Sequence, residues 1–220
     1  MFFPWADLLP ESIELVALEP PGRASRSAER SFDHIQTLIE ILTPAFASQQ
    51  DKIPFGFFGH SLGALVVFEL ARSLRREQAQ QPCALWISGR RAPHLPSWNP
   101  IDPNGSDHEL MERMEGSGLN LSALAPAVRD LLLPVLRSDL SLAASYRFCD
   151  EAPLISHLTV LGGVDDRLVS ESELQDWFIH TTGPRKLFMF PGGHDYLDQS
   201  QPVIADIIVS TVRLLASAKK

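Results

Sequence analysis

Hydrophobic residues along the chain follow two alternating spacings. Runs that are apolar at nearly every position are typical of strands buried on both faces of a sheet. Such runs occur at residues 13–18, 53–58, 83–89, 155–161 and 186–190. Between them, apolar residues recur every three or four positions, which predicts helices. These helices are expected at residues 31–48 (with Ser31 as N-cap), 64–74, 172–180 and 202–218. Strands separated by helices indicate an α/β fold, a mostly parallel sheet with helices on both faces, in one domain over residues 1–220.

The strand spacing disappears between residues 92 and 145. A proline-rich loop from Pro93 to Pro103 leads into helical patterns at residues 110–114, 124–133 and 135–146. Ligands of open α/β sheets bind at the carboxyl edge of the strands. We therefore interpret residues 96–145 as a helical lid insertion over that edge. Its leucines between residues 119 and 136 either line an apolar channel or pack the lid onto the body.

One glycine-flanked serine lies between a predicted strand and a predicted helix. The stretch Gly59-His60-Ser61-Leu62-Gly63 follows the apolar run 53–58 and precedes the helix 64–74. This is the strand–turn–helix context of a nucleophile elbow, in which a tight, strained turn lifts the serine hydroxyl clear of the sheet. Gly59 and Gly63 are expected where a Cβ would strike the neighbouring helix or strand. The first free N–H groups of the helix would then face the oxygen that Ser61 attacks.

A nucleophilic serine needs a base, and the base needs a carboxylate to orient it. In α/β-hydrolases the chain order is Ser, then Asp or Glu, then His, each after a strand. His194 follows the strand 186–190 and a glycine pair, and is the expected general base. Asp165 and Asp166 both follow the strand 155–161, and only one of them can face the imidazole. Both loops lie at the carboxyl edge, as Ser61 does.

Other residues near these strand ends have two possible roles each. His60 adjoins the nucleophile, and we expect it to make structural hydrogen bonds rather than act as the base. Arg23, Arg26, Arg90 and Arg91 follow strands. They either rim the cleft or lie on the solvated surface, where charged side chains are usually found.

Composition and charge exclude several classes of partner. The 220 residues carry a net charge of −8, with a pI of about 5.3, which argues against nucleic acid and anionic membranes. No apolar run is long enough to span a bilayer, and the first residues lack a basic, then apolar, signal-peptide pattern, so the cytoplasm is expected. Cys83 and Cys149 lie in apolar surroundings and are expected to be buried, reduced thiols. No cysteine–histidine cluster has the spacing of a zinc site.

Several short motifs together resemble one family, the stand-alone type II thioesterases of nonribosomal peptide and polyketide synthesis. Residues 3–10 resemble the first helix of that family. The L-x-x-P-G-R turn is similar to residues 18–23, G-H-S-[ML]-G to 59–63, S-G-R-x-A-P to 88–93, L-P-x-[LF]-R-A-D to 133–139, and G-G-H to 192–194. A general lipase would share the elbow and the G-G-H motif but not the other three, so the resemblance is specific.

The resemblance implies an α/β-hydrolase that removes acyl groups from the phosphopantetheine thiol of acyl or peptidyl carrier domains. It favours Asp166 over Asp165 as the third catalytic residue beside Ser61 and His194, because Asp-x-x-Val after a glycine turn is the usual form of that loop. It also implies an oxyanion hole that includes the backbone N–H of Leu62. No metal or redox cofactor is needed for this mechanism, and a monomer is expected.

The chain departs from the family pattern at its start. The family has a strand and an F-P-x-A-G-G loop before its first helix, and that loop supplies the second oxyanion N–H. Nothing before Phe2 corresponds to them, so we expect a missing strand beside the elbow strand and an exposed sheet edge. Either the natural protein carries about thirty more residues, or the chain is a truncated homologue with little activity. A carboxylesterase or acyltransferase acting on free esters is a further alternative.

Overall fold

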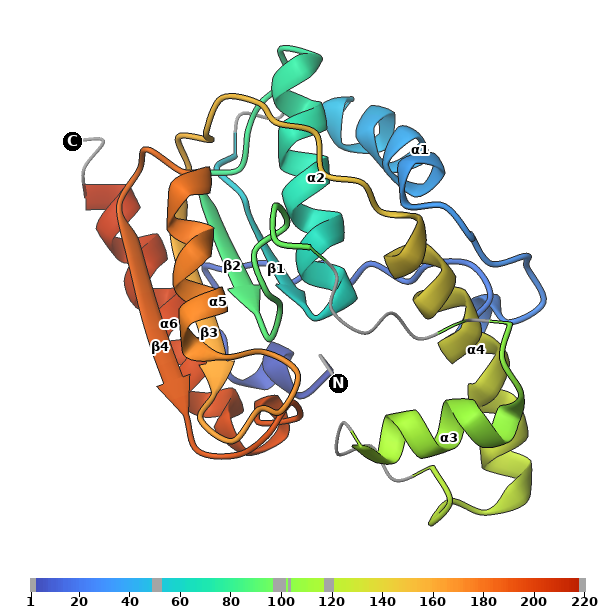
Figure 1. Ribbon diagram of the computed structural model, residues 1–220. Coiled ribbons are helices and arrows are strands. Elements are labelled where there is room, and N and C mark those ends of the chain that lie inside the picture. Colours follow the sequence, from blue (N-terminus) through green and yellow to red (C-terminus); the bar gives the residue numbers. More distant parts are fainter. Residues whose placement is uncertain (1–2, 49–52, 97–101, 103, 117–120, 218–220) are drawn as a thin grey trace.

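The computed structural model describes residues 3–48, 53–96, 102, 104–116 and 121–217. Among these residues, four parallel strands form one sheet in the order β1-β2-β3-β4 (Figure 1). The strands are β1 (Gly56–His60), β2 (Ala84–Ser88), β3 (His157–Gly163) and β4 (Arg185–Phe190). The helices are η1 (Phe3–Asp7), η2 (Ala24–Arg26), α1 (Ile35–Ala47), α2 (Leu62–Arg76), α3 (Asp107–Gly116), α4 (Pro126–Ser145), α5 (Glu171–Gln175), η3 (Asp176–His180) and α6 (Leu197–Ser217). The predicted α/β class is confirmed.

Apolar side chains of successive strand residues pack on opposite faces of the sheet. In β2, Leu85 and Ile87 pack with α1 and α2 in one cluster, whereas Ala84 and Trp86 pack with η1 and α6 in the other. Figure 1 shows the same division, with α6 behind the sheet and α2 and α5 on the opposite side. Because a strand points alternate residues to opposite faces, the near-continuous apolar runs bury the sheet on both sides, as predicted.

The helical insertion forms a separate arm at one side of the sheet, made of α3 and α4 (Figure 1). Leu110, Leu121 and Leu133 form a small core within this arm, and Leu136 both packs against that core and lines the large cavity described below. The helical patterns expected at 124–133 and 135–146 are one continuous helix, α4, with Pro134 inside it. Leu119 lies outside the described residues.

Two expectations about the N-terminal third are wrong. Residues 13–18 form no strand, and Val16 is 76% exposed. A strand requires a neighbour for its backbone hydrogen bonds, and no described strand pairs with this segment. The helix expected from Ser31 begins at Ile35, with His34 as its N-cap residue. The Ile35 N–H donates instead to Ser145 Oγ, 3.1 Å away at the end of α4.

Among the described strands, β1 has a partner on one side only, β2. A cavity of about 2020 Å³ borders β1 and continues to the carboxyl edge of the sheet. Its walls include the irregular segment 12–20 as well as α1, α2 and the last turns of α6. Within the described part of the chain, no helix is both long and apolar enough to cross a bilayer.

Candidate active site

Ser61 occupies a sharp turn between β1 and α2. Its backbone has φ +53° and ψ −116°, a conformation that L-residues rarely adopt. The turn is held by a hydrogen bond of 2.8 Å from the Ser61 N–H to the Ser88 carbonyl at the end of β2. Leu62 is the first residue of α2, so its N–H has no acceptor within the helix and remains available beside the serine hydroxyl.

The two glycines of the elbow have different roles. A Cβ on Gly59 would lie 2.3 Å from the carbonyl oxygen of Gly63, so the close approach of β1 and α2 requires glycine at this position. A Cβ on Gly63 would meet no atom within 4 Å. The expectation that both glycines avoid a clash is therefore wrong for Gly63, which faces open space at the start of the helix.

These contacts predict opposite results for two alanine substitutions. Gly59→Ala should lower the free energy of unfolding by about 1–3 kcal/mol, because backbone atoms must move apart. Gly63→Ala, the matched control, should be neutral or stabilising by up to about 1 kcal/mol, because alanine is the better helix former. Urea unfolding of both variants measures the difference. An equal loss of stability in both would contradict the packing described for Gly59.

The structure brings Ser61, His194 and Asp166 into one hydrogen-bonded chain. His194 Nε2 lies 3.1 Å from Ser61 Oγ, and His194 Nδ1 lies 2.8 Å from Asp166 Oδ2. The Asp166 carboxyl group is only 1% exposed, and its other oxygen accepts the Leu168 N–H at 2.8 Å. An imidazole protonated at Nδ1 donates to this carboxylate and leaves Nε2 to accept the serine proton.

The loops that carry Asp166 and His194 hold each other in place. The Val164 N–H donates to the Phe190 carbonyl at 2.8 Å, and the Asp165 N–H donates to the Gly192 carbonyl at 2.9 Å. Asp165 is exposed, so its contribution to this arrangement comes from its backbone. Of the two adjacent aspartates, the side chain that reaches the imidazole is that of Asp166.

His60 lies beside the imidazole of His194 and is largely shielded from solvent. Its Nδ1 lies 2.8 Å from Ser88 Oγ, which in turn lies 2.5 Å from the Tyr196 hydroxyl. Its ring centroid is 5.0 Å from that of His194. Burial, reinforced by the positive charge of His194 and opposed by Asp166, lowers the pKa of His60 to about 3. His60 is thus neutral at physiological pH and hydrogen bonded to Ser88.

The shifted pKa of His60 predicts that stability depends on pH. Below its ordinary pKa of about 6.5, the unfolded chain binds a proton at this residue, whereas the folded chain does so only near pH 3. The free energy of unfolding should therefore rise with pH through this window and level off above it. His60→Asn should reduce the slope by about 1 kcal/mol per pH unit between pH 5 and 6. Urea unfolding at both pH values tests this, and an unchanged slope would contradict it.

Sequence reasoning did not find Ser88 and Tyr196. Both were visible as polar residues at the same sheet edge, since Ser88 ends β2 and Tyr196 follows His194 by two positions. Neither has a type or spacing that predicts a hydrogen bond between them. The thiols are less buried than expected, because Cys83 is half-buried and Cys149 is exposed on the segment that returns from α4.

The four arginines that follow the predicted strands differ in where their side chains lie. Arg23, Arg90 and Arg91 line the cavity that also contains Ser61 and His194, whereas Arg26 pairs with Glu29 at the surface. Arg23 forms an ion pair of 2.5 Å with Asp139 of α4, which joins the turn after residue 20 to the lid. Among the described residues, no group of three or more His, Cys, Asp or Glu side chains is placed to hold a metal ion.

The similarity of this chain to known proteins covers both the sheet and the helical insertion. A family model described as "Thioesterase domain" matches residues 1–213. The gramicidin S biosynthesis protein GrsT of Aneurinibacillus migulanus is 31% identical over 220 residues, covering 99% of this chain and 86% of that protein. Thioesterase PikA5 of Streptomyces venezuelae is 34% identical over 215 residues, covering 94% and 74%. The structure of RedJ, a thioesterase of the prodiginine pathway in Streptomyces coelicolor, aligns with a TM-score of 0.86 and 31% identity, covering 94% and 83%.

Proposed function

Because the chain belongs to the thioesterase domain family, we propose that it hydrolyses acyl groups from the phosphopantetheine thiol of acyl or peptidyl carrier domains in nonribosomal peptide or polyketide synthesis. The observation that carries this proposal is the hydrogen-bonded chain Ser61–His194–Asp166, whose serine and histidine line a large, mainly apolar cavity. Relatives named for gramicidin S biosynthesis and for the prodiginine biosynthetic pathway support the substrate class. Neither a metal nor a redox cofactor enters the reaction.

In the first half-reaction, Ser61 Oγ attacks the thioester carbonyl carbon while His194 Nε2 takes the hydroxyl proton. Asp166 holds the imidazole in the tautomer that can accept it and stabilises the resulting positive charge. The oxyanion accepts a hydrogen bond from the Leu62 N–H at the start of α2. The carbon–sulfur bond then breaks, and the imidazolium gives its proton to the departing thiolate. The product is an acyl ester on Ser61.

In the second half-reaction, a water molecule attacks the ester carbonyl while His194 takes one of its protons. The carbon–oxygen bond to Ser61 breaks, and the proton passes from His194 to Ser61 Oγ. The free carboxylic acid leaves and the enzyme returns to its starting state. The apolar walls contributed by α2 and α4 provide space for the acyl chain.

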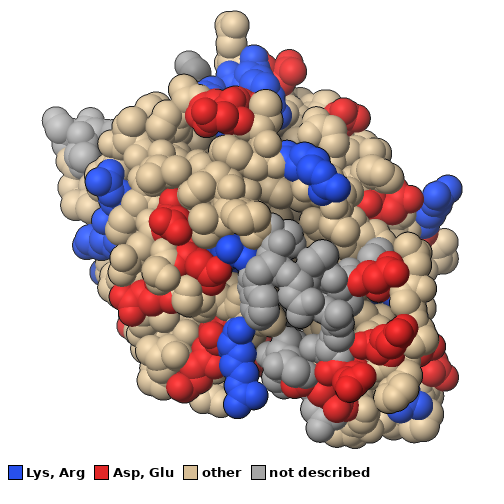
Figure 2. All heavy atoms as spheres, viewed as in Figure 1, with Lys and Arg blue, Asp and Glu red and all other residues tan. Residues whose placement is uncertain are grey.

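A carrier domain would have to dock through local contacts rather than long-range attraction. Figure 2 shows acidic side chains gathered at the end of the molecule where α3 lies, with basic side chains scattered over this face. The acidic residues of α3 are Asp107, Glu109, Glu112 and Glu115. Since the chain carries a net charge of −8 and carrier domains are usually acidic as well, the overall fields repel each other. The cytoplasmic location and the monomeric state stay predictions.

Turnover on two substrate classes tests the proposal. The enzyme should hydrolyse a butyryl thioester on a holo carrier domain with a far higher kcat/KM than p-nitrophenyl butyrate, a free ester with the same acyl group. A fluorophosphonate probe should label the wild type and not Ser61→Ala. Faster turnover of the free ester would identify a carboxylesterase. Absence of labelling in a folded wild type would identify an inactive homologue.

A further inference from the structure

Ser88, the last residue of β2, contacts both of the loops that carry the nucleophile and the general base. Ser61 follows β1 and His194 follows β4, so these loops leave from opposite edges of the sheet, and β2 lies between them. The Ser88 carbonyl accepts the Ser61 N–H at 2.8 Å. The Ser88 hydroxyl oxygen lies 2.5 Å from the hydroxyl of Tyr196, two residues beyond His194. One fully buried residue therefore joins the two loops.

Tyr196 is held firmly within the loop that carries His194. Its ring stacks on that of Phe190, the last residue of β4, with centroids 5.3 Å apart and planes inclined by 10°. Its N–H donates to the Gly193 carbonyl at 3.2 Å, and the side chain is buried. Because ring and main chain are both fixed within this loop, the contact of the Tyr196 hydroxyl with Ser88 restrains the whole loop relative to β2.

The directions of the hydrogen bonds around Ser88 follow from what each group can donate. Within the described ranges, the Tyr196 hydroxyl has Ser88 Oγ as its one hydrogen-bond partner, so its proton points there. The Ser88 hydroxyl then donates to Nδ1 of neutral His60, 2.8 Å away. Both hydroxyl protons have an acceptor in this arrangement, and Ser88 connects Tyr196 to the residue that precedes the nucleophile.

The two imidazole rings leave little free space at the end of β2. A Cβ on Gly89 would lie 2.5 Å from His60 Cε1 and 3.4 Å from His194 Cε1. The backbone after Ser88 is therefore close to both rings. A shift of the loop that carries His194 relative to β2 would change the distance of 3.1 Å between His194 Nε2 and Ser61 Oγ.

We propose that Ser88 and Tyr196 are positioning residues, whose hydrogen bond holds His194 Nε2 where it can take the proton of Ser61. Reacting groups must lie within about 3–3.5 Å of each other, and a displacement of about 1 Å can lower a rate on the order of 100-fold. This inference rests on the hydrolytic site of the proposed function. It concerns the activation of Ser61 and is independent of which acyl group is hydrolysed.

Tyr196→Phe removes the hydroxyl and keeps the stacked ring. It should lower kcat for a butyryl thioester on a holo carrier domain by about tenfold, and the rate at which a fluorophosphonate labels Ser61 should fall by the same factor. KM should stay the same, because the contact acts on the chemical step rather than on binding. Circular dichroism verifies that the variant is folded.

Thr43→Val is the matched control for loss of a buried hydroxyl. Thr43 Oγ1 donates to Ser73 Oγ at 2.9 Å between α1 and α2, which is also a contact between two hydroxyl groups. This substitution should leave kcat and the labelling rate unchanged, even where it lowers stability. An equal fall in Thr43→Val and Tyr196→Phe would assign the effect to general destabilisation and overturn the inference.

A double substitution tests whether the two residues act through their shared hydrogen bond. Ser88→Ala leaves the Tyr196 hydroxyl and His60 Nδ1 without their partner, so it should slow labelling more than Tyr196→Phe does. Adding Tyr196→Phe to Ser88→Ala should cause no further loss, because the contact is already absent. A loss in the double variant equal to the product of the two single losses would contradict the proposal.

The labelling rate separates failure of this inference from failure of the proposed function. Unchanged labelling and kcat in a folded Tyr196→Phe would overturn the positioning role and leave the thioesterase function standing. A raised KM with unchanged kcat would assign Tyr196 to substrate binding and also overturn it. A wild type that is labelled but hydrolyses no thioester would remove the proposed function, while slower labelling of Tyr196→Phe would still support the positioning role. A folded wild type that is not labelled would remove both.

Discussion

Replacing Asp166 by Asn is expected to lower kcat about 10⁴-fold without unfolding the enzyme. The amide has nearly the same shape as the carboxylate, but its NH₂ group can donate to His194 Nδ1 and so favour the tautomer that cannot accept the Ser61 proton. It also removes the negative charge that stabilises the imidazolium. The substitution alters the 2.8 Å hydrogen bond between the buried Asp166 carboxylate and His194 Nδ1.

The neighbouring aspartate provides the control. Asp165 is exposed and contributes its backbone N–H to the loop, so Asp165→Asn should change kcat less than about threefold. Steady-state hydrolysis of one carrier-bound thioester by the three proteins, with circular dichroism to verify folding, measures both effects. If Asp165→Asn were the more damaging change, the loop would have to rearrange in solution and the proposed triad would be wrong.

The positions of the reactive groups could be predicted because they depend on chain order and strand ends. Continuous apolar runs identified β1 to β4, and polar residues directly after them must meet at one sheet edge. That argument placed Ser61 and His194 together, although they are 133 positions apart. It could not choose between Asp165 and Asp166, since adjacent residues share the same strand end. The choice depends on side-chain direction within one turn.

Features that depend on distant contacts could not be predicted from local pattern. The segment 13–18 has the composition of a strand, yet no strand among the described residues pairs with it and it stays irregular. The first N–H of α1 is satisfied by Ser145, 110 positions away, so Ser31 is not needed as a cap. Pro134 suggested a helix boundary, because proline removes a helical hydrogen bond. Leu133 and Leu142 are buried on either side of it, and α4 continues.

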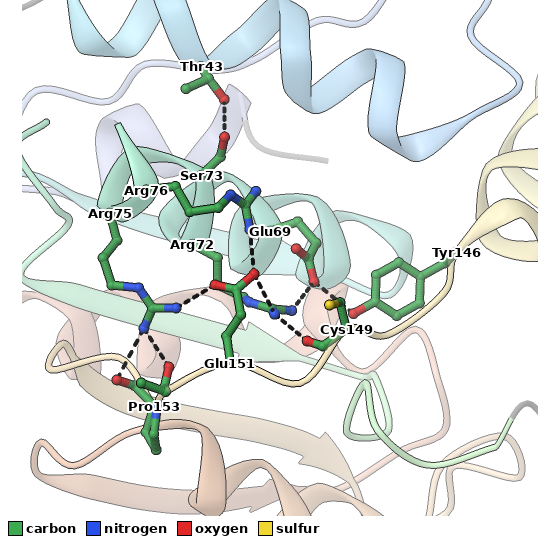
Figure 3. A network of polar contacts seen from close by, with 11 residues as sticks. Thr43, Glu69, Arg72, Ser73, Arg75, Arg76, Tyr146, Cys149, Glu151 and Pro153 are labelled. Carbon is green, nitrogen blue, oxygen red and sulfur yellow. Dashed lines mark hydrogen bonds and ion pairs between the residues drawn. The ribbon is translucent and has the colours of Figure 1, made fainter. Parts of the chain in front are cut away.

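A cluster of arginines on α2 holds the segment that returns from α4 against that helix (Figure 3). Arg72 of α2 is 3% exposed and pairs with Glu69 at 2.7 Å and with Glu151 at 2.9 Å. It also donates to the Cys149 carbonyl and lies over the rings of two phenylalanines. Burial acts to raise the pKa of Glu151, but hydrogen bonds and charges from the arginines outweigh it and the pKa is lowered.

Arg72→Met is therefore expected to lower the free energy of unfolding by about 3–5 kcal/mol, because it keeps the bulk of the side chain but leaves the enclosed carboxylate of Glu69 without its cationic partner. Arg76→Met is the matched control. Arg76 contacts the same Glu151 at 2.7 Å but is 40% exposed, and such surface pairs contribute less than about 1 kcal/mol. Urea unfolding of both variants at pH 7 provides the comparison. Equal losses of stability in the two variants would show that burial does not strengthen the ion pairs of Arg72. A large loss in Arg72→Met alone would show that this residue anchors the segment that returns from α4 to α2.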